Sequence, residues 1–156
     1  MECRRATLTT ASALLLAGCS YGVETLPKCF SENVPPSLRA VAQLARSNQY
    51  KGGVVDLTHM LCSTYDDRLG TAEKLLTAAG FPHETGIAEL GKCIDVDVKT
   101  RLTSQVLDQQ VTTFCGIAAA ARVAYVSWSG RVGEKFVYVS GKYISITGRG
   151  ELPKPL

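Results

Sequence analysis

Residues 92–98, KCIDVDV, alternate between two kinds of side chain. The apolar residues Ile94, Val96 and Val98 occupy every second position, with a cysteine and two aspartates between them. Successive side chains of a β-strand point to opposite faces of a sheet, so an alternating stretch has two different faces. Residues 92–98 therefore predict a strand with one face against a core and one polar face toward solvent.

A segment with helical periodicity lies on each side of this strand. In the first, over residues 66–80, the apolar positions are Leu69, Ala72, Leu76 and Ala79. We expect Asp66 or Asp67 to cap its first amides, and Gly80 with Pro82 to end it. The second segment begins near Thr103, and its apolar positions are Leu107, Val111, Phe114 and Ala118. Both segments predict amphipathic helices.

Further strands are predicted on both sides of this unit. The run VVDLTHMLCST (54–64) is rich in β-branched residues and apolar on both faces, which favours a central strand, although its length also permits a helix. From Arg122 onward three short alternating runs are separated by glycine: RVAYVSWSG, GEKFVYVSG and KYISITG. They predict antiparallel strands. A less regular extended stretch lies near residues 84–90.

The predicted order from residue 53 is strand, helix, extended stretch, strand, helix, strand, strand. This order resembles a ferredoxin-like βαββαβ plait, which implies an α+β fold with two helices packed on an antiparallel sheet. A short N-terminal helix is predicted after Pro36 and Ser37, where the apolar positions are Leu38, Val41, Ala42 and Ala45. We expect one domain over residues 37–148 and a flexible tail over residues 149–156.

The first residues have the character of an export signal. Arg4 and Arg5 precede an uncharged segment, residues 6–18, which has the length of a signal-peptide hydrophobic region and is too short to span a membrane. The segment ends in LAGC (16–19), which resembles the lipobox of bacterial lipoprotein precursors. The resemblance implies a signal peptide over residues 1–18 and a diacylglycerol on the sulfur of Cys19. The alternative is a buried helix that ends in these residues by coincidence.

Lipidation also implies a location. Two or three acyl chains anchor a protein stably, whereas one chain holds it only marginally. Because Ser20 is not aspartate, sorting of the enterobacterial type implies the outer membrane facing the periplasm, an inference that does not apply to a Gram-positive organism. CRRATL resembles a twin-arginine signal except at Thr7, so the export route stays open. We expect residues 19–36, with three prolines and no sustained periodicity, to form a lipidated tether.

Four of the six cysteines remain when the leader and the lipidated residue are set aside. An even number in an oxidising compartment favours two disulfides over free thiols, and the absence of a CxxC motif argues against a metal site. In a ferredoxin-like plait the end of the first strand lies near the start of the third. The resemblance therefore implies a Cys62–Cys93 bridge, which leaves Cys29 for Cys115.

Candidate catalytic residues are few. Asp56, His59 and Ser63 could be imagined as a hydrolytic triad on a helix, but on a strand Asp56 and His59 point to opposite faces, and no glycine elbow surrounds Ser63. His83 follows Pro82, and we expect it in a surface turn. These residues give little support for an enzyme.

Ligand classes are also limited by the sequence. Asp95 and Asp97 would make only a weak cation site without further carboxylates, so we expect a solvated sheet face and neither a metal nor a cofactor. The net charge of +3, with no uninterrupted basic block, gives no support for a nucleic-acid partner.

The last third of the chain is basic and aromatic. Tyr125, Tyr138 and Tyr143, with Lys142, would form a binding face if they share one side of the sheet; the alternative is that these rings belong to the core. We therefore expect a membrane-anchored lipoprotein with a non-enzymatic binding or structural role, whose partner is peptidoglycan or an envelope protein. No pattern in the sequence indicates an oligomeric state.

Two alternative functions stay open. VSGKY (139–143) is similar to the SGxxY signature of lysozyme inhibitors but is one residue short, and those inhibitors are largely β-barrels, unlike a chain with predicted helices. An inhibitor of a periplasmic hydrolase is therefore the first alternative. A small periplasmic hydrolase that uses Asp56, His59 and Ser63 is the second.

Overall fold

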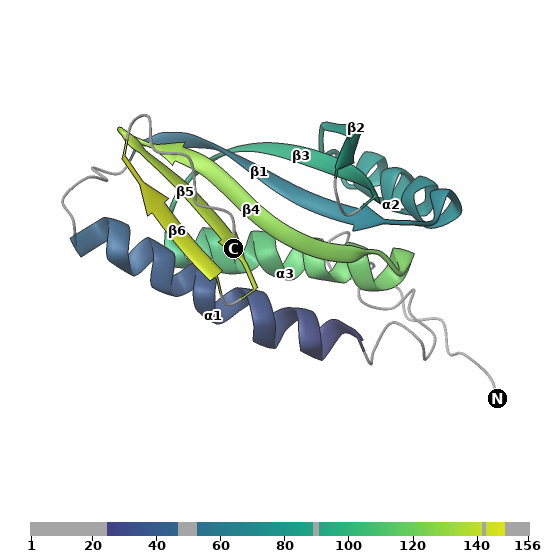
Figure 1. Cartoon of the computed structure of the whole chain (residues 1–156), viewed down its shortest axis with the longest axis horizontal. Coiled ribbons are helices and arrows are strands. Elements are labelled where there is room, and N and C mark those ends of the chain that lie inside the picture. Colours follow the sequence, from purple (N-terminus) through teal and green to yellow (C-terminus); the bar gives the residue numbers. More distant parts are fainter. Residues whose placement is uncertain (1–24, 47–52, 89–90, 142, 149–156) are drawn as a thin grey trace, which may run out of the picture.

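The computed structural model describes residues 25–46, 53–88, 91–141 and 143–148. An antiparallel six-stranded sheet has the strand order β2-β3-β1-β4-β5-β6. Its strands are β1 (Val54–Ser63), β2 (His83–Ala88), β3 (Gly91–Arg101), β4 (Ala124–Val132), β5 (Lys135–Ser140) and β6 (Tyr143–Thr147). The helices are α1 (Thr25–Arg46), α2 (Asp66–Ala78) and α3 (Ser104–Ala121). Figure 1 shows α1 and α3 side by side along the sheet, with α2 beside β2.

The chain passes through β1, α2, β2, β3, α3 and β4 in the order of a ferredoxin-like plait. In the sheet, β1 lies in the centre between β3 and β4 and runs antiparallel to both. β5 and β6 extend the sheet beyond β4 as a hairpin. The predicted fold class is confirmed, since two helices pack on an antiparallel sheet and α1 is added before them.

β1 is a strand, as its β-branched composition favoured. The side chains of Val55, Leu57 and Leu61 are buried at alternating positions, while Val54 and Asp56 are exposed on the other face. A strand with neighbours on both sides has every backbone group available for sheet hydrogen bonds, which a helix in this place could not offer to β3 and β4.

α2 follows the predicted spacing, and its buried residues are Leu69, Ala72 and Leu76. Its N-cap, however, is Tyr65, whose side chain makes no capping hydrogen bond. Asp66 and Asp67 lie in the first turn instead, where their charges interact favourably with the positive end of the helix dipole. After Ala78 the chain turns at Gly80, whose φ of 77° is in the left-handed region that favours glycine.

α3 begins where the sequence predicted. The side chain of Thr103 accepts a hydrogen bond from the backbone amide of Val106 at 3.1 Å and so caps the helix. Its buried face is broad, comprising Leu107, Val111, Phe114, Cys115, Ile117, Ala118, Ala119 and Ala121. The small alanines near its end let α3 pack closely against its neighbours.

α1 is longer than expected. It begins at Thr25, so residues 25–36 belong to a helix of the folded domain, and the interpretation of residues 19–36 as a lipidated tether that precedes the domain is wrong for that part. Residues 19–24 lie outside the described residues. The segment that could link an anchor to the domain is therefore shorter than the sequence suggested.

Tertiary contacts maintain α1 through two internal prolines. Pro35 and Pro36 have no amide hydrogen for the carbonyls one turn earlier, which disfavours a helix on local grounds. Around them, the side-chain amide of Asn33 donates to the carbonyl of Cys29 at 2.9 Å, and the buried hydroxyl of Ser37 donates to the carbonyl of Asn33 at 2.6 Å. These side-chain bonds and the packing of α1 on α3 outweigh the local cost.

Two disulfides join the four cysteines of the described residues. Cys29–Cys115 links α1 to α3, with a Cα–Cα distance of 5.8 Å. Cys62–Cys93 links directly paired positions of β1 and β3, with a Cα–Cα distance of 4.1 Å. Both pairings are those implied by the ferredoxin-like arrangement.

The three helices bury their apolar sides in a single core with the inward residues of the sheet. Trp128 of β4 lies in this core and donates its indole hydrogen to the hydroxyl of Ser37 in α1 at 2.8 Å. Among the described residues, no helix covers the opposite face, which we call the open face. No helix in that part of the chain is both long and apolar enough to cross a membrane.

Candidate functional site: the open face of the sheet

The candidate trio Asp56, His59 and Ser63 is kept apart by β1. The Asp56 carboxylate lies on the open face, 3.8 Å from the ammonium nitrogen of Lys99, whereas His59 is completely buried on the helix side. The Ser63 hydroxyl accepts a hydrogen bond from the backbone amide of Tyr65 at 3.0 Å. Side chains of a strand alternate between its two faces, so residues three positions apart point to opposite sides. This strand therefore cannot bring the Asp56 carboxylate to the His59 ring. The three residues form no catalytic relay.

His59 lies in a hydrogen-bonded network between the sheet and α3. Its Nδ1 is 2.9 Å from the Tyr125 hydroxyl, and its Nε2 is 3.2 Å from Oε1 of Gln110. In the assignment that satisfies all three groups, Tyr125 donates to Nδ1 and the Nε2 hydrogen is donated to Gln110. The ring of Phe114 lies against the imidazole, with a centroid distance of 4.3 Å. Both ring nitrogens are occupied, so His59 is a structural residue of the core.

Burial determines the protonation of this network. Desolvation lowers the pKa of His59 from 6.5 to about 4, while the hydrogen bond to Gln110 acts in the opposite direction. Burial also raises the pKa of Tyr125 well above its ordinary value. Both side chains are therefore neutral near neutral pH.

Tyr125 is consequently not part of a shared tyrosine face, which corrects the sequence-based hypothesis. The register between β1 and β4 shifts between Met60 and Leu61, because Met60 pairs with Ser127 whereas Leu61 pairs with Tyr125. Val126 is the extra residue of this β-bulge. A bulge reverses the alternation of side chains beyond it, and so Tyr125 points into the core.

Tyr138 and Tyr143 do share the open face. Val137 and Val139 on either side of Tyr138 are buried, so Tyr138 points away from the helices. The two tyrosine rings pack edge to face, with centroids 6.2 Å apart and an interplanar angle of 60°. Both side chains are partly exposed, and we call them the tyrosine pair. Lys142, the predicted cation between the strands, lies outside the described residues.

Hydroxyl side chains continue from the tyrosine pair across the sheet. Tyr138 pairs with Ser129 on β4 and with Ser145 on β6. Ser129 pairs in turn with Thr58 on β1, whose hydroxyl donates to Oδ1 of Asp97 on β3 at 2.6 Å. These residues form one row across β6, β5, β4, β1 and β3, which we call the hydroxyl row. It ends at the carboxylate of Asp97.

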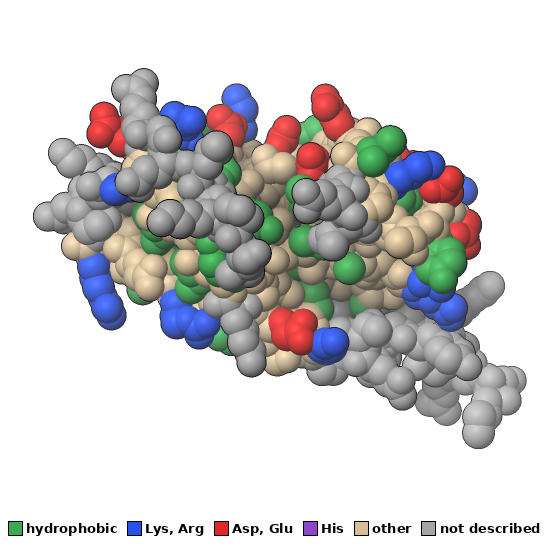
Figure 2. All heavy atoms as spheres, in the orientation of Figure 1, with side chains coloured by type: hydrophobic (Ala, Val, Ile, Leu, Met, Phe, Trp, Pro, Cys, Tyr) green, Lys and Arg blue, Asp and Glu red, His purple; other side chains and the backbone are tan. Residues whose placement is uncertain are grey.

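Carboxylates gather at the β2–β3 end of the open face. Glu84 pairs directly with Asp95, and Asp97 lies two positions farther along the same face. Partial burial, and then the negative charges of Asp97 and Glu84, raise the pKa of Asp95. Figure 2 shows acidic side chains along the upper surface of the molecule, where Figure 1 shows the sheet. In the described part of the chain, no group of three or more His, Cys, Asp or Glu side chains is placed to hold a metal ion.

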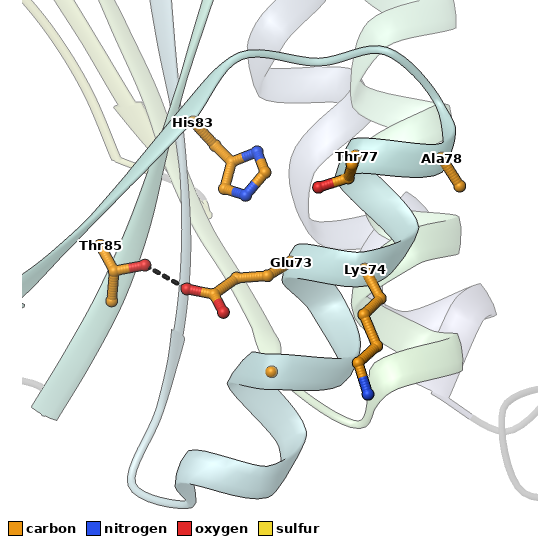
Figure 3. Close-up of a pocket in the computed structure, with 7 residues that line it drawn as sticks. Glu73, Lys74, Thr77, Ala78, His83 and Thr85 are labelled. Carbon is orange, nitrogen blue, oxygen red and sulfur yellow. Dashed lines mark hydrogen bonds between the residues drawn. The ribbon is translucent and has the colours of Figure 1, made fainter.

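A separate open groove lies between α2 and β2 (Figure 3). Its lining comprises Gly70, Glu73, Lys74, Thr77, Ala78, His83 and Thr85. Thr85 donates a hydrogen bond to the Glu73 carboxylate, and Nδ1 of His83 donates to the carbonyl of Phe81 at 2.9 Å. His83 was predicted in a surface turn; it is the first residue of β2 and is partly buried.

Sequence reasoning missed the hydroxyl row and the polar groove. The hydroxyl row depends on strand register, whereas the groove has a recognisable signal in the sequence. Glu73 and Thr77 are four residues apart on the polar side of a predicted helix, and His83 and Thr85 alternate on the strand that follows. The pairing that brings the two segments together could not be seen in either segment alone.

The chain was compared with protein-family models and with curated proteins, and neither comparison found a match. The grounds for a function are therefore the sequence motif at Cys19 and the geometry of the open face.

Proposed function

We propose that the protein is a bacterial envelope lipoprotein, lipidated at Cys19 and held at the outer membrane facing the periplasm. Its domain has a non-enzymatic role, in which the open face binds peptidoglycan. The observation that supports an oxidising compartment outside the cytoplasm is the pairing of Cys29 with Cys115 and of Cys62 with Cys93. Once Cys3 and Cys19 are assigned to the leader and the lipid, no cysteine of the chain remains without a disulfide partner.

Disulfides persist in oxidising compartments and are rare where thiols are kept reduced, so this complete pairing supports export. The LAGC motif, on which the assignment of Cys19 rests, supports the same conclusion, since it predicts cleavage and acylation after translocation. Acylation with two or three chains would then hold the domain at a membrane, because each buried methylene contributes about 0.8 kcal/mol.

The tyrosine pair supports a glycan ligand. Tyrosine rings present a flat apolar face together with a hydroxyl group, and this combination suits the alternating apolar and polar surfaces of sugar rings. Ser129 and Ser145 flank Tyr138 with further hydroxyl groups that can donate to and accept from sugar hydroxyls. The partly exposed edge-to-face geometry leaves ring surface available for stacking.

The acidic end of the open face supports a ligand that also carries amines. Asp97 on β3 ends the hydroxyl row, and Asp95 lies two positions away on the same face. The peptide stems of peptidoglycan contain free amino groups, which would be attracted to these carboxylates. A polymer of sugars and short peptides therefore matches both halves of the open face.

Lipidation is tested on the protein produced in its natural host. We expect the mature N-terminus to be Cys19 with acyl chains attached, as measured by mass spectrometry of the membrane fraction. A Cys19→Ser variant should lose the lipid and accumulate as unprocessed precursor. An unprocessed N-terminus on a soluble intracellular product would overturn the proposal.

Binding is tested by co-sedimentation of the protein with purified peptidoglycan sacculi. The variant Tyr138→Ala/Tyr143→Ala should lose most of its co-sedimentation while its circular dichroism stays unchanged, because the tyrosine pair lies outside the core. Tyr65→Ala is a matched control, since Tyr65 is 55% exposed but lies at the end of the sheet. Equal retention of all three proteins would refute the peptidoglycan role.

Inhibition of a periplasmic hydrolase is the second candidate. One observation favours it: Gly141, at φ 51°, forms the turn between β5 and β6 and so places Tyr143 beside Tyr138 at a hairpin. The open sheet with helices differs from the β-barrels of known lysozyme inhibitors. Addition of the protein to a lysozyme assay distinguishes the two roles, because a binding lipoprotein leaves the rate unchanged.

A further inference from the structure

Exposed apolar side chains mark one end of the sheet. Among the described residues, the large apolar side chains most exposed to solvent are Ile87 at 89%, Val54 at 66% and Tyr65 at 55%. Ile87 pairs with Lys92, which pairs with Ser63 at the end of β1, and Tyr65 follows two residues later. Neighbouring strands are about 4.8 Å apart, so Ile87 and Ser63 are separated by about 10 Å. Val54 lies at the opposite end of β1.

Two cations flank these apolar side chains. The guanidinium of Arg68 lies over the Tyr65 ring, 4.2 Å from its centroid. The ammonium group of Lys92 donates to Oδ2 of Asp66 at 2.9 Å, and both side chains remain half exposed or more. Tyrosine, arginine and lysine combine an apolar body with a polar tip, which suits the boundary between a lipid surface and water. We call Tyr65, Arg68, Ile87 and Lys92 the anchor-end surface.

The N-terminus of the domain emerges at this same end. The Cys29–Cys115 disulfide aligns the second turn of α1 with the second half of α3, and α3 ends at Ala121. In Figure 1 the purple start of α1 lies in the same half of the molecule as α2 and the start of β4, with α3 between α1 and α2. The chain that leads back to Cys19 therefore joins the domain toward the same end of the strands as the anchor-end surface, on the other side of α3.

The length of that chain limits the distance to the lipid. Thr25, where α1 begins, is the sixth residue after Cys19. Six residues span at most roughly 20 Å in any conformation. The headgroup region on one side of a bilayer is itself about 5 to 8 Å thick. A lipidated Cys19 would therefore hold the start of α1 within roughly 20 Å of the lipid headgroups.

We infer that the anchor-end surface rests in the phospholipid headgroup layer of the membrane that holds Cys19. This inference depends on the proposed lipidation and adds an orientation to it. The strands then rise away from the membrane. Thr58, in the same row as Tyr138, precedes Ser63 by five positions, so Tyr138 would stand about 17 Å farther from the lipid. Tyr143 pairs with Ser140, two positions nearer that end, and would stand about 10 Å farther from the lipid. In this orientation the open face is available to a cell-wall polymer.

The test uses the lipidated full-length protein, inserted from outside into preformed vesicles of phosphatidylethanolamine and phosphatidylglycerol. Lysines are labelled with a membrane-impermeant amine reagent and quantified by mass spectrometry. We expect Lys92 to lose most of its labelling, whereas Lys99, on the same strand but 82% exposed near the far end, is labelled fully. The variant Tyr65→Ser/Ile87→Ser should restore labelling of Lys92, and the matched control Val54→Ser should not.

Each outcome decides between the inference and its alternatives. Full labelling of Lys92 on vesicle-bound protein would overturn the orientation while leaving lipidation intact. Protection that persists in Tyr65→Ser/Ile87→Ser would also overturn it, because the apolar side chains would then not make the contact. Protection that increases with protein density would indicate a contact between copies and overturn the lipid assignment. A protein that fails to float with vesicles and carries no acyl mass would overturn lipidation, and this inference with it.

Discussion

The Tyr125 hydroxyl lies 2.9 Å from Nδ1 of His59, between the sheet and α3. His59, a candidate for catalysis, and Tyr125, a candidate for ligand binding, are therefore hydrogen-bonding partners within the core. Because each satisfies the other away from water, their contribution is to stability and not to a reaction. The binding surface that we propose is therefore on the opposite side of the sheet, where Tyr138 and Tyr143 lie.

We expect the free energy of unfolding to decrease as the pH falls from 6.5 toward 4. Over this interval the unfolded chain binds a proton at His59 that the folded chain does not, since the folded pKa is about 4. The free energy of unfolding is therefore highest above pH 6.5. Near pH 4 it should be lower by on the order of 3 kcal/mol. Urea denaturation at several pH values measures this dependence.

His59→Gln provides the comparison for the pH prediction. Glutamine does not titrate, so the variant should show a shallower dependence between these pH values, whatever its absolute stability. The raised pKa of Asp95 acts in the opposite direction, adding stability at low pH that is lost as the pH rises. An Asp95→Asn background removes that contribution. Identical pH slopes with and without His59 would refute the role of this histidine.

Tyr125→Phe should destabilise the protein by about 1 to 3 kcal/mol, because the buried Nδ1 of His59 would lose its donor. Tyr65→Phe removes a hydroxyl from an exposed ring and should change stability by less than about 0.5 kcal/mol. Chemical denaturation of both variants at neutral pH gives the comparison. A neutral effect of Tyr125→Phe would mean that another group satisfies His59.

The two disulfides should differ in their contribution to stability. Cys29–Cys115 closes a sequence separation of 86 residues and Cys62–Cys93 one of 31. In the chain-entropy model these bridges contribute about 4 to 5 and about 3 to 4 kcal/mol, respectively. In thermal denaturation of the two double cysteine-to-serine variants, the variant without Cys29–Cys115 should have the lower melting temperature. The opposite order would show that packing around the strands matters more than loop length.

Gly130→Ala and Gly116→Ala should have effects of opposite sign. A Cβ at Gly130 would lie 2.6 Å from the carbonyl oxygen of Asp56 and from Cδ2 of Leu57, so β4 would have to shift from β1. We expect a loss of about 1 to 3 kcal/mol. A Cβ at Gly116 in α3 meets nothing within 4 Å, and alanine should add up to about 1 kcal/mol through helix propensity. Denaturation midpoints of the two variants test this pair.

Local periodicity was sufficient to predict the fold class. The alternation around Ile94 and Val96 predicted β3, and the spacing of Leu69 and Leu76 predicted α2, since each pattern expresses contacts within one element. The order of these elements then pointed to the βαββαβ topology, which in turn implied the Cys62–Cys93 pair.

Local patterns failed where distant residues decide the outcome. Pro35 and Pro36 argued against a helix that packing on α3 and the Cys29–Cys115 bridge maintain. Tyr125 follows the alternation of an open-face residue, but the bulge at Val126 directs it inward. A bulge is a property of two paired strands, so β4 alone carries no sign of it.

The sequence by itself determined the kind and order of the strands and helices, and it supplied the motif at Cys19, because these depend on residues close together in the chain. Only the tertiary structure decided where α1 begins and which aromatic side chains face outward. Those outcomes depend on strand register, a bulge and packing between segments far apart, and their energies exist only once the segments are in contact.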